Sequence, residues 1–135
     1  MIRRWNPDTL AAPIGTYSHL AHVPADHELV VVSGQVGVLP DGELAGADAQ
    51  AQGRAVFANI ERLLEAAGAS PAQLVRVFSM VSGTEHLPGY RAALRETFVR
   101  WYPEGDWPAQ SLIVVAALAT PEILVEVEAM IAIPR

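Results

Sequence analysis

The sequence predicts an α+β domain in which two helices lie on one face of a sheet. Runs with apolar residues at alternate positions are typical of strands, and two segments between residues 48 and 102 have the spacing of three and four that is typical of helices. The predicted order of elements is β-β-β-α-β-α-β-β. Because the 135 residues contain no linker, repeat or break in composition, we expect one domain over residues 1–135.

The first third of the chain is strand-like. His19–Val23 predicts a short strand that leads to a turn at Pro24. Leu29–Val38 is rich in β-branched residues and predicts a longer strand. The Pro40-Asp41-Gly42 sequence that follows predicts a turn.

The segment from Asp48 to Ala67 predicts the first helix, and Gly68 supplies its C-terminal cap. Ser70-Pro71 predicts one short helical turn. The apolar stripe of the first helix is formed by Phe57, Ile60, Leu64 and Ala67.

The second half alternates between strand and helix. Val75–Ser82 predicts a strand with Val75, Val77 and Val81 on one face, and Pro88–Tyr102 predicts the second helix. That helix carries Tyr90, Leu94, Phe98 and Trp101 on one stripe and ends before Pro103. The last two strands are expected over Gln110–Leu118 and Ile123–Ile133.

The last strand places carboxylates among apolar residues. One of its faces is wholly apolar and is expected to pack under the helices. The other face, which no helix of this chain is expected to cover, carries Leu124, Glu126, Glu128, Met130 and Ala132. Such a face is either exposed to water or buried by another copy of the chain, and a buried carboxylate needs a partner.

The composition excludes several classes of enzyme. All nine basic residues are arginine, and the chain has no lysine and no cysteine. Schiff-base catalysis, lysine-bound pyridoxal phosphate and Walker-type phosphate loops need a lysine. Thiol nucleophiles, thiolate zinc sites and iron–sulfur clusters need a cysteine.

Charge and hydropathy argue against nucleic-acid and membrane partners. The net charge is −6 and the arginines form no basic run, whereas a polyanion needs clustered positive charge. The longest apolar stretches, at 112–118 and 123–133, are too short or too interrupted to span a bilayer. Because the N-terminus has no apolar segment of signal-peptide length, we expect a cytoplasmic protein.

The histidines and serines do not form a recognisable centre. His19, His22 and His27 are spaced so that they do not share one strand face, and we expect them at the surface or in loops, with no metal site. No Gly-x-Ser-x-Gly sequence occurs, which argues against a serine nucleophile.

Five stretches, in order along nearly the whole chain, resemble the RidA family, also called YjgF or endoribonuclease L-PSP. They are Ala12–Ser18 (APIGTYS), Val32–Gln35 (VSGQ), Asn59–Gly68, Pro108–Ser111 (PAQS) and Val125–Ala129 (VEVEA). The resemblance implies a fold like that of chorismate mutase from Bacillus, with a mixed sheet. It also implies a homotrimer whose three sheets form a central barrel, with small-molecule clefts between neighbouring subunits.

Archetypal members of that family hydrolyse reactive enamines and imines to 2-keto acids and ammonia, with no metal or organic cofactor. By position, Glu126 matches the glutamate that activates or positions the attacking water, and Tyr17 matches a tyrosine that holds the substrate or the water. Ser33 and Gly34 match the segment whose backbone lines the pocket, and Glu128 matches a glutamate with a structural role. The net charge argues against the ribonuclease activity that the older family name suggests.

The chain departs from the family pattern at the pocket. Gln110 stands where the family has an arginine that binds the substrate carboxylate, and Leu112 stands where some members have a cysteine. Arg91 stands where deaminating members often have an asparagine. It would restore the charge if it reached the cleft, and would not if it is solvated beside Arg95. Trp107 ends a loop that belongs to the family's site.

Two functions therefore remain open. The first is a cofactor-independent hydrolase that acts on an enamine, imine or related carbonyl compound, with a specificity altered by Gln110. The second is a non-catalytic metabolite-binding or sensor trimer. A purely structural role would need only the trimer.

Overall fold

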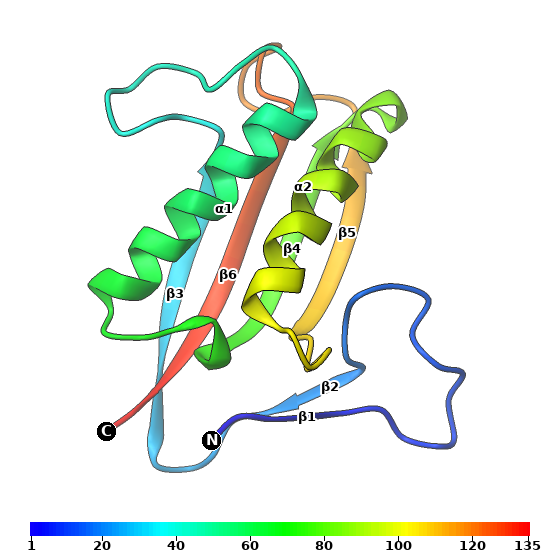
Figure 1. Ribbon diagram of the computed structural model, residues 1–135, viewed down its shortest axis with the longest axis vertical. Helices are drawn as coiled ribbons and strands as arrows, with labels where there is room; N and C mark the ends of the chain where they lie inside the picture. The colour runs from blue at the N-terminus through cyan, green and yellow to red at the C-terminus, as the bar shows by residue number, and fades with distance from the viewer.

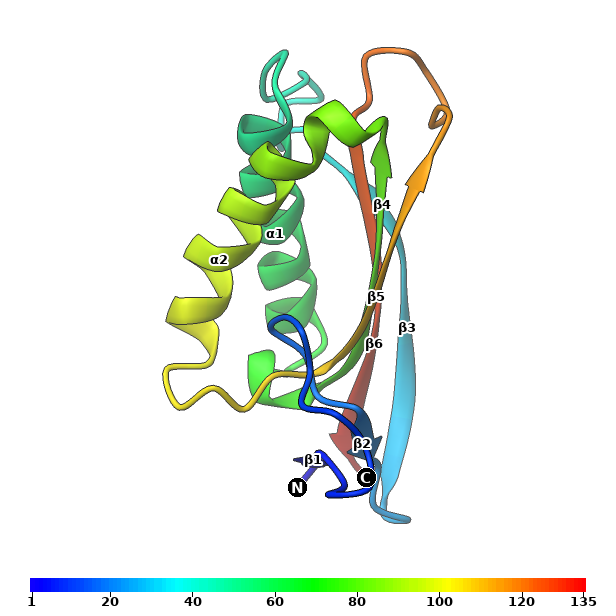
Figure 2. The ribbon, with the colours of Figure 1, turned by 90° about the vertical axis from the view of Figure 1, so that its right-hand side faces the viewer.

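Two helices cover one face of a four-stranded sheet in the computed structural model, which describes all 135 residues, Met1–Arg135 (Figure 1). Helix α1 spans Ala49–Ala66 and helix α2 spans Leu87–Trp101. Seen from the side, the helices form one layer and the sheet the other (Figure 2). The predicted α+β class and the predicted order of elements are confirmed.

The sheet is mixed. Its strands lie in the order β3 (His27–Val36), β6 (Val125–Pro134), β4 (Leu74–Ser82) and β5 (Ala109–Val115). β6 is antiparallel to both of its neighbours, and β5 is parallel to β4. A parallel pair needs a long crossover, which α2 supplies between β4 and β5. β3 and β5 are therefore the edges of the sheet.

The N-terminal strands form a small separate sheet. β1 (Arg3–Trp5) pairs with β2 (Leu20–His22), and a buried arginine attaches this pair to the rest of the fold. Arg4, whose side chain is 2% exposed, donates hydrogen bonds to the carbonyl oxygens of Ala72 (3.1 Å) and Leu74 (2.6 Å) and pairs with Asp106. Because the partners lie about seventy or more positions away, no local pattern predicts this contact.

The ends of the helices follow local signals. The side chain of Asp48 accepts a hydrogen bond from the backbone N–H of Ala51 at 2.8 Å, and α1 ends before Gly68, whose φ of 70° suits glycine. The short turn expected after Ser70 is a 3₁₀ turn over Pro71–Gln73. A second 3₁₀ turn, Thr84–His86, leads into α2.

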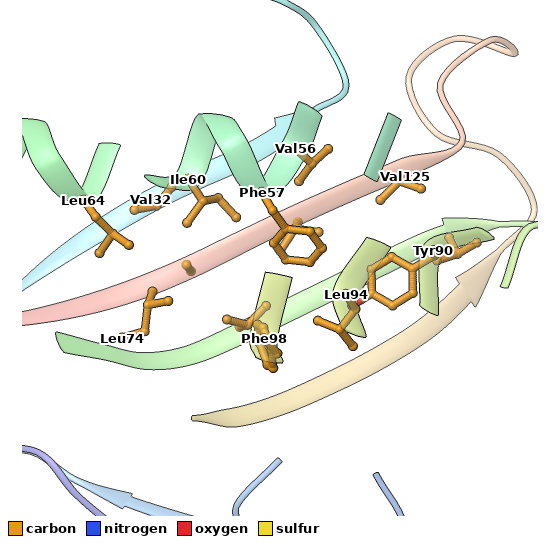
Figure 3. Packing of buried hydrophobic residues seen from close by; sticks show 14 of the residues in the cluster. Val32, Val56, Phe57, Ile60, Leu64, Leu74, Tyr90, Leu94, Phe98 and Val125 are labelled. Carbon is orange, nitrogen blue, oxygen red and sulfur yellow. The ribbon is translucent and has the colours of Figure 1, made fainter. Parts of the chain in front are cut away.

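The core lies between the helices and the sheet (Figure 3). Phe57 and Ile60 from α1 and Phe98 from α2 are at most 1% exposed. They pack on the face of the sheet that carries Val77 and Val127, both fully buried. Burying each such side chain contributes about 1.5–3 kcal/mol, so this layer holds the helices on the sheet.

The alternation predicted for β4 is wrong at its start. A register shift between Leu74 and Arg76 places Leu74, not Val75, in the core, where it is fully buried. An extra residue in one strand moves the following side chains to the other face, and sequence periodicity does not show it.

The last two strands are shorter at their junction than expected. The N–H of Leu124 donates to Oε1 of Gln52 at 2.8 Å, so the ladder of β6 begins at Val125. Leu124 is buried in the core and not on the uncovered face as expected, whereas Ala132 lies opposite Leu29 on that face and is fully buried.

The face of the sheet away from the helices is uncovered in this chain (Figure 2). We call it the open face. Its exposed apolar side chains are Leu29 (58%) and Val31 (71%) on β3, Ile113 (44%) on β5 and Met130 (38%) on β6. Neither helix of this fold combines the length and the apolar character needed to cross a membrane.

Candidate functional site

A cleft of about 740 Å³ lies between the N-terminal loop around Tyr17, one side of α2 and the edge strand β5. The loop supplies Gly15, Thr16 and Tyr17. The other lining residues include Tyr90, Arg91 and Arg95 of α2 and Gln110 and Leu112 of β5. The structure thus brings together Tyr17, Arg91, Gln110 and Leu112 from three separate parts of the chain.

Tyr90 fixes the orientation of Gln110. The hydroxyl of Tyr90 donates to Oγ of Ser79 at 2.5 Å and accepts a hydrogen bond from Nε2 of Gln110 at 3.0 Å. Burial raises the pKa of Tyr90 to about 12, so the phenol keeps its proton at neutral pH. Gln110 is left with its carbonyl oxygen and one N–H for a ligand.

The N-terminal loop holds Tyr17 at the cleft by contacts of its own. The hydroxyl of Tyr17 accepts a hydrogen bond from the N–H of Ile14 at 3.4 Å, and its ring meets the ring of His19 edge to face at 5.7 Å. Ser18 attaches the loop to the entry of β5, because its N–H donates to Pro108 at 3.1 Å and its Oγ donates to the carbonyl of Trp107 at 2.6 Å.

A second hollow, of about 300 Å³, lies on the open face and is lined by Ser33, Gly34 and Glu128 among others. Glu126 is half-buried on the same face, opposite Met80 of β4. A Cβ at Gly34 would overlap the Glu126 carboxylate, so glycine leaves the space that this side chain occupies.

The predicted site residues therefore form two groups in one chain. Tyr17, Arg91, Gln110 and Leu112 line the cleft, whereas Ser33, Gly34 and Glu126 lie on the open face. Gln110 bonds to helix α2 on the covered side of β5, and β4 separates it from Glu126. One copy of the chain does not bring the two groups together.

Trp107 and the histidines lie outside both hollows. The ring of Trp107 stacks on Phe98 with centroids 6.0 Å apart and packs against the core. His27 was expected at the surface and is instead 8% exposed, with its Nδ1 2.8 Å from Asp26. Nδ1 has this partner because Asp26 directly precedes His27, at the end of the turn before β3. Nowhere do three candidate metal ligands come together.

Sequence reasoning did not place Arg95 and Tyr90 in the site. Arg95 lies one helical turn after Arg91, and residues four apart on a helix share a face, which was the available signal. Tyr90 belongs to the apolar stripe of α2, and only its contact with Gln110, twenty positions away, gives it a place beneath the cleft.

Comparison with known proteins identifies the family. The family model described as endoribonuclease L-PSP matches residues 9–133. The chain belongs to the endoribonuclease L-PSP family. This confirms the resemblance to RidA proteins, and the matched range includes the residues of both hollows, from Ile14 to Met130.

Solved structures and a curated relative agree with this L-PSP assignment. A Rid family protein, YyfB from Yersinia pestis, is 33% identical, with 98% of each chain covered and a TM-score of 0.85. E. coli TdcF with bound serine is 26% identical, with 76% of this chain and 79% of TdcF covered and a TM-score of 0.68. A 2-iminobutanoate/2-iminopropanoate deaminase from Dermatophagoides farinae is 27% identical over 122 residues, which cover 90% of this chain and 88% of the relative.

Proposed function

We propose that this L-PSP family member is a cytoplasmic, cofactor-independent hydrolase of an enamine, imine or related carbonyl compound. The observation that carries the proposal is the division of the site residues between a cleft and the open face. Tyr17 and Gln110 line a cleft that contains no carboxylate, and Glu126 lies on a face that nothing in this chain covers. The site is complete only where two copies meet.

The exposed apolar residues of the open face support such an assembly. Leu29, Val31 and Met130 lie on neighbouring strands with their side chains 38–71% exposed. Contiguous apolar surface of this kind marks an interface. In the homotrimer that we propose, the open faces form a central barrel, and Glu126 of one copy meets the cleft of its neighbour.

The chemistry needs one oriented water and one base. The Glu126 carboxylate takes a proton from water as the water oxygen bonds to the imine carbon, and passes this proton to the imine nitrogen. The resulting carbinolamine transfers its hydroxyl proton, through the same carboxylate, to the nitrogen, which leaves as ammonia as the C=O bond forms. Tyr17 holds the ligand or the water through its hydroxyl. Atoms balance as imine plus water to ketone plus ammonia, without an oxidant or cofactor.

Gln110 changes what this hydrolase recognises. An arginine at this position would offer a charged fork to a carboxylate, whereas Gln110 offers a neutral amide. Loss of one partner of a desolvated charge pair costs about 2–5 kcal/mol. We therefore propose that Gln110 recognises the carboxylate of simple 2-imino acids poorly, that these compounds are poor substrates, and that the natural substrate differs from them.

The test is ammonia release from freshly generated 2-aminoacrylate by the purified protein. We expect slow release that is lost in Glu126→Ala and raised in Gln110→Arg. Glu128→Ala, on the same strand and face, is the matched control and should retain the wild-type rate. A rate that Glu126→Ala leaves unchanged would refute the role of Glu126 as the base.

The alternative function is a metabolite-binding or sensor trimer. It is favoured by the hydrogen bond that ties Gln110 to Tyr90 and by a cleft without a base in the single chain. It predicts saturable ligand binding with no ammonia release from any enamine or imine, and binding that Glu126→Gln does not alter.

A further inference from the structure

Two arginines on α2 face the cleft. Arg91 and Arg95 are four positions apart, so they lie one above the other on the helix, and both line the cleft while remaining exposed to solvent. Two like charges at this spacing repel each other, which destabilises the helix slightly unless an anion lies between them.

No acidic side chain of the same chain neutralises this pair. Arg54 pairs with Glu96 at 2.8 Å and Arg100 with Glu61 at 2.7 Å, whereas neither Arg91 nor Arg95 has a carboxylate within 4.0 Å. The acid nearest to Arg95 in sequence, Glu96, is turned to α1, where it binds Arg54.

The cleft is thus a positive site on a negative protein. Within one chain its lining contains two arginines and no aspartate or glutamate, a charge of +2 that the Glu126 of a neighbouring copy would reduce to +1, while the whole chain carries −6. The positive charge of such a cleft raises the local concentration of small anions, although the protein as a whole is negative. The volume of about 740 Å³ suits a small metabolite.

The other polar groups of the cleft are neutral. One N–H of Gln110 Nε2 is engaged by Tyr90, which leaves the carbonyl oxygen as an acceptor and the second N–H as a donor. A ligand that places an anionic end at the arginines can therefore place a hydrogen-bond donor, such as an N–H or O–H, at Gln110. Guanidinium groups bind both carboxylates and phosphates through paired N–H donors.

We propose that Arg91 and Arg95 form an anion clamp and that the ligand of this cleft is a small dianion, either a dicarboxylate or a phosphate ester. The inference rests on the proposed function only in taking this cleft as the ligand site. It assigns the recognition of the anion to α2 in place of the arginine that Gln110 replaces on β5. A dianion satisfies both guanidinium groups, and a single carboxylate satisfies one.

Isothermal titration at low ionic strength and pH 8 tests the clamp with three probes of one carbon skeleton. Succinate, succinamate and succinamide carry two, one and no negative charges. We expect affinity to fall about tenfold with each charge removed, and the affinity for succinate to fall as salt is added. A second series compares glycerol 3-phosphate with glycerol as its neutral control. Whichever of succinate and glycerol 3-phosphate binds more tightly shows whether the cleft prefers carboxylates or a phosphate.

Variants locate the effect. Arg91→Gln and Arg95→Gln should each weaken the tighter dianion about tenfold and leave succinamide unchanged. Arg62→Gln removes the same charge from the exposed side of α1 and should change neither. The clamp would be overturned if both dianions bound no more tightly than their neutral controls. It would also be overturned if Arg62→Gln lost as much affinity for the dianion as Arg91→Gln and Arg95→Gln.

A combined measurement separates this inference from the proposed hydrolase. Glu126→Gln should keep the binding of the dianion while abolishing ammonia release. Arginine-dependent binding with ammonia release that does not depend on Glu126 would refute the hydrolase and leave the clamp standing. Release that depends on Glu126, without any preference for dianions, would refute the clamp alone.

Discussion

The two faces of the sheet differ in what covers their apolar residues. On the covered face, Val77, Val127 and Ile131 are fully buried beneath the helices. On the open face, Val31 and Leu29 are 71% and 58% exposed although they stand on a strand of the same sheet. Both faces of the sheet therefore carry apolar residues, but the helices of this chain cover only one of them.

The two faces also differ in their expected roles. The covered face stabilises the fold, and its polar groups, such as Ser79, have partners inside the chain. The open face carries Glu126 and Glu128 among apolar neighbours and has its own hollow. Apart from Trp107, the predicted site residues divide between this face and the cleft, so we expect the contact between copies to assemble the site.

The largest expected effect compares the loss of one phenylalanine from the covered face with the loss of one from the open face. Phe57 is 1% exposed and contacts the rings of Tyr90, Phe98 and Trp101, whereas Phe78 lines the hollow of the open face. We expect Phe57→Ala to lower the free energy of unfolding by about 3–5 kcal/mol at every protein concentration. Phe78→Ala should cost about 1 kcal/mol in dilute solution and more as concentration rises.

Urea denaturation at several protein concentrations measures both variants. Equal losses that do not depend on concentration would mean that the open face is part of the core of a single chain.

Two exposed valines sharpen the comparison at the level of assembly. Val31 lies on the open face and Val99 on the outer side of α2, 71% and 61% exposed. A charge buried between copies is unfavourable, so we expect Val31→Asp to weaken self-association by about 2–3 kcal/mol, roughly 30- to 150-fold. Val99→Asp should have no effect on the assembly.

Sedimentation equilibrium measures the association of the wild type and of both variants. A monomeric wild type, or an assembly that Val31→Asp leaves intact, would contradict the proposed interface.

The smallest effect concerns the contact that joins the two covering helices. Hydrogen bonds from Arg100 and then from Trp101 hold the pKa of Glu61 below its usual 4.5. Because the folded state lowers this pKa, the stabilisation is present above pH 4.5 and is lost as the pH falls through the lower, folded value. Glu61 is 35% exposed, so we expect at most about 1 kcal/mol.

Glu61→Gln should therefore reduce the free energy of unfolding at pH 7 and equal the wild type in strong acid. Glu65→Gln, an exposed position one turn further along α1, is the control. A difference between wild type and Glu61→Gln that stays constant from pH 7 to strong acid would show that the ion pair does not contribute.

Local signals in the sequence predicted much of the fold. Asp48 caps α1, the spacing of Phe57, Ile60 and Leu64 predicts its buried face, and Gly68 follows its end, all as observed. The register shift near Val75 and the early end of β5 were not predicted, because each depends on how neighbouring strands pair.

The candidate site was predicted through family resemblance, and its partners were not. Tyr17 and Gln110 stand in recognisable stretches, but nothing in the sequence indicates that Tyr90 bonds to Gln110. The spacing of Arg95 from Arg91 indicated that the two share a helix face, but not whether that face lines a cleft or open solvent.

The amino-acid order by itself determined the class of fold, the helices with their caps and the alternation that places Glu126 and Glu128 opposite the core. These follow from interactions within a few residues, which a linear pattern records. Only the tertiary structure decided that Leu74 replaces Val75 in the core and that Arg4 attaches the N-terminal strands. It also decided that Arg91 and Arg95 line the same cleft as Gln110. Those outcomes depend on which distant segments meet, and the free energy of such contacts belongs to the packed chain rather than to any stretch of it.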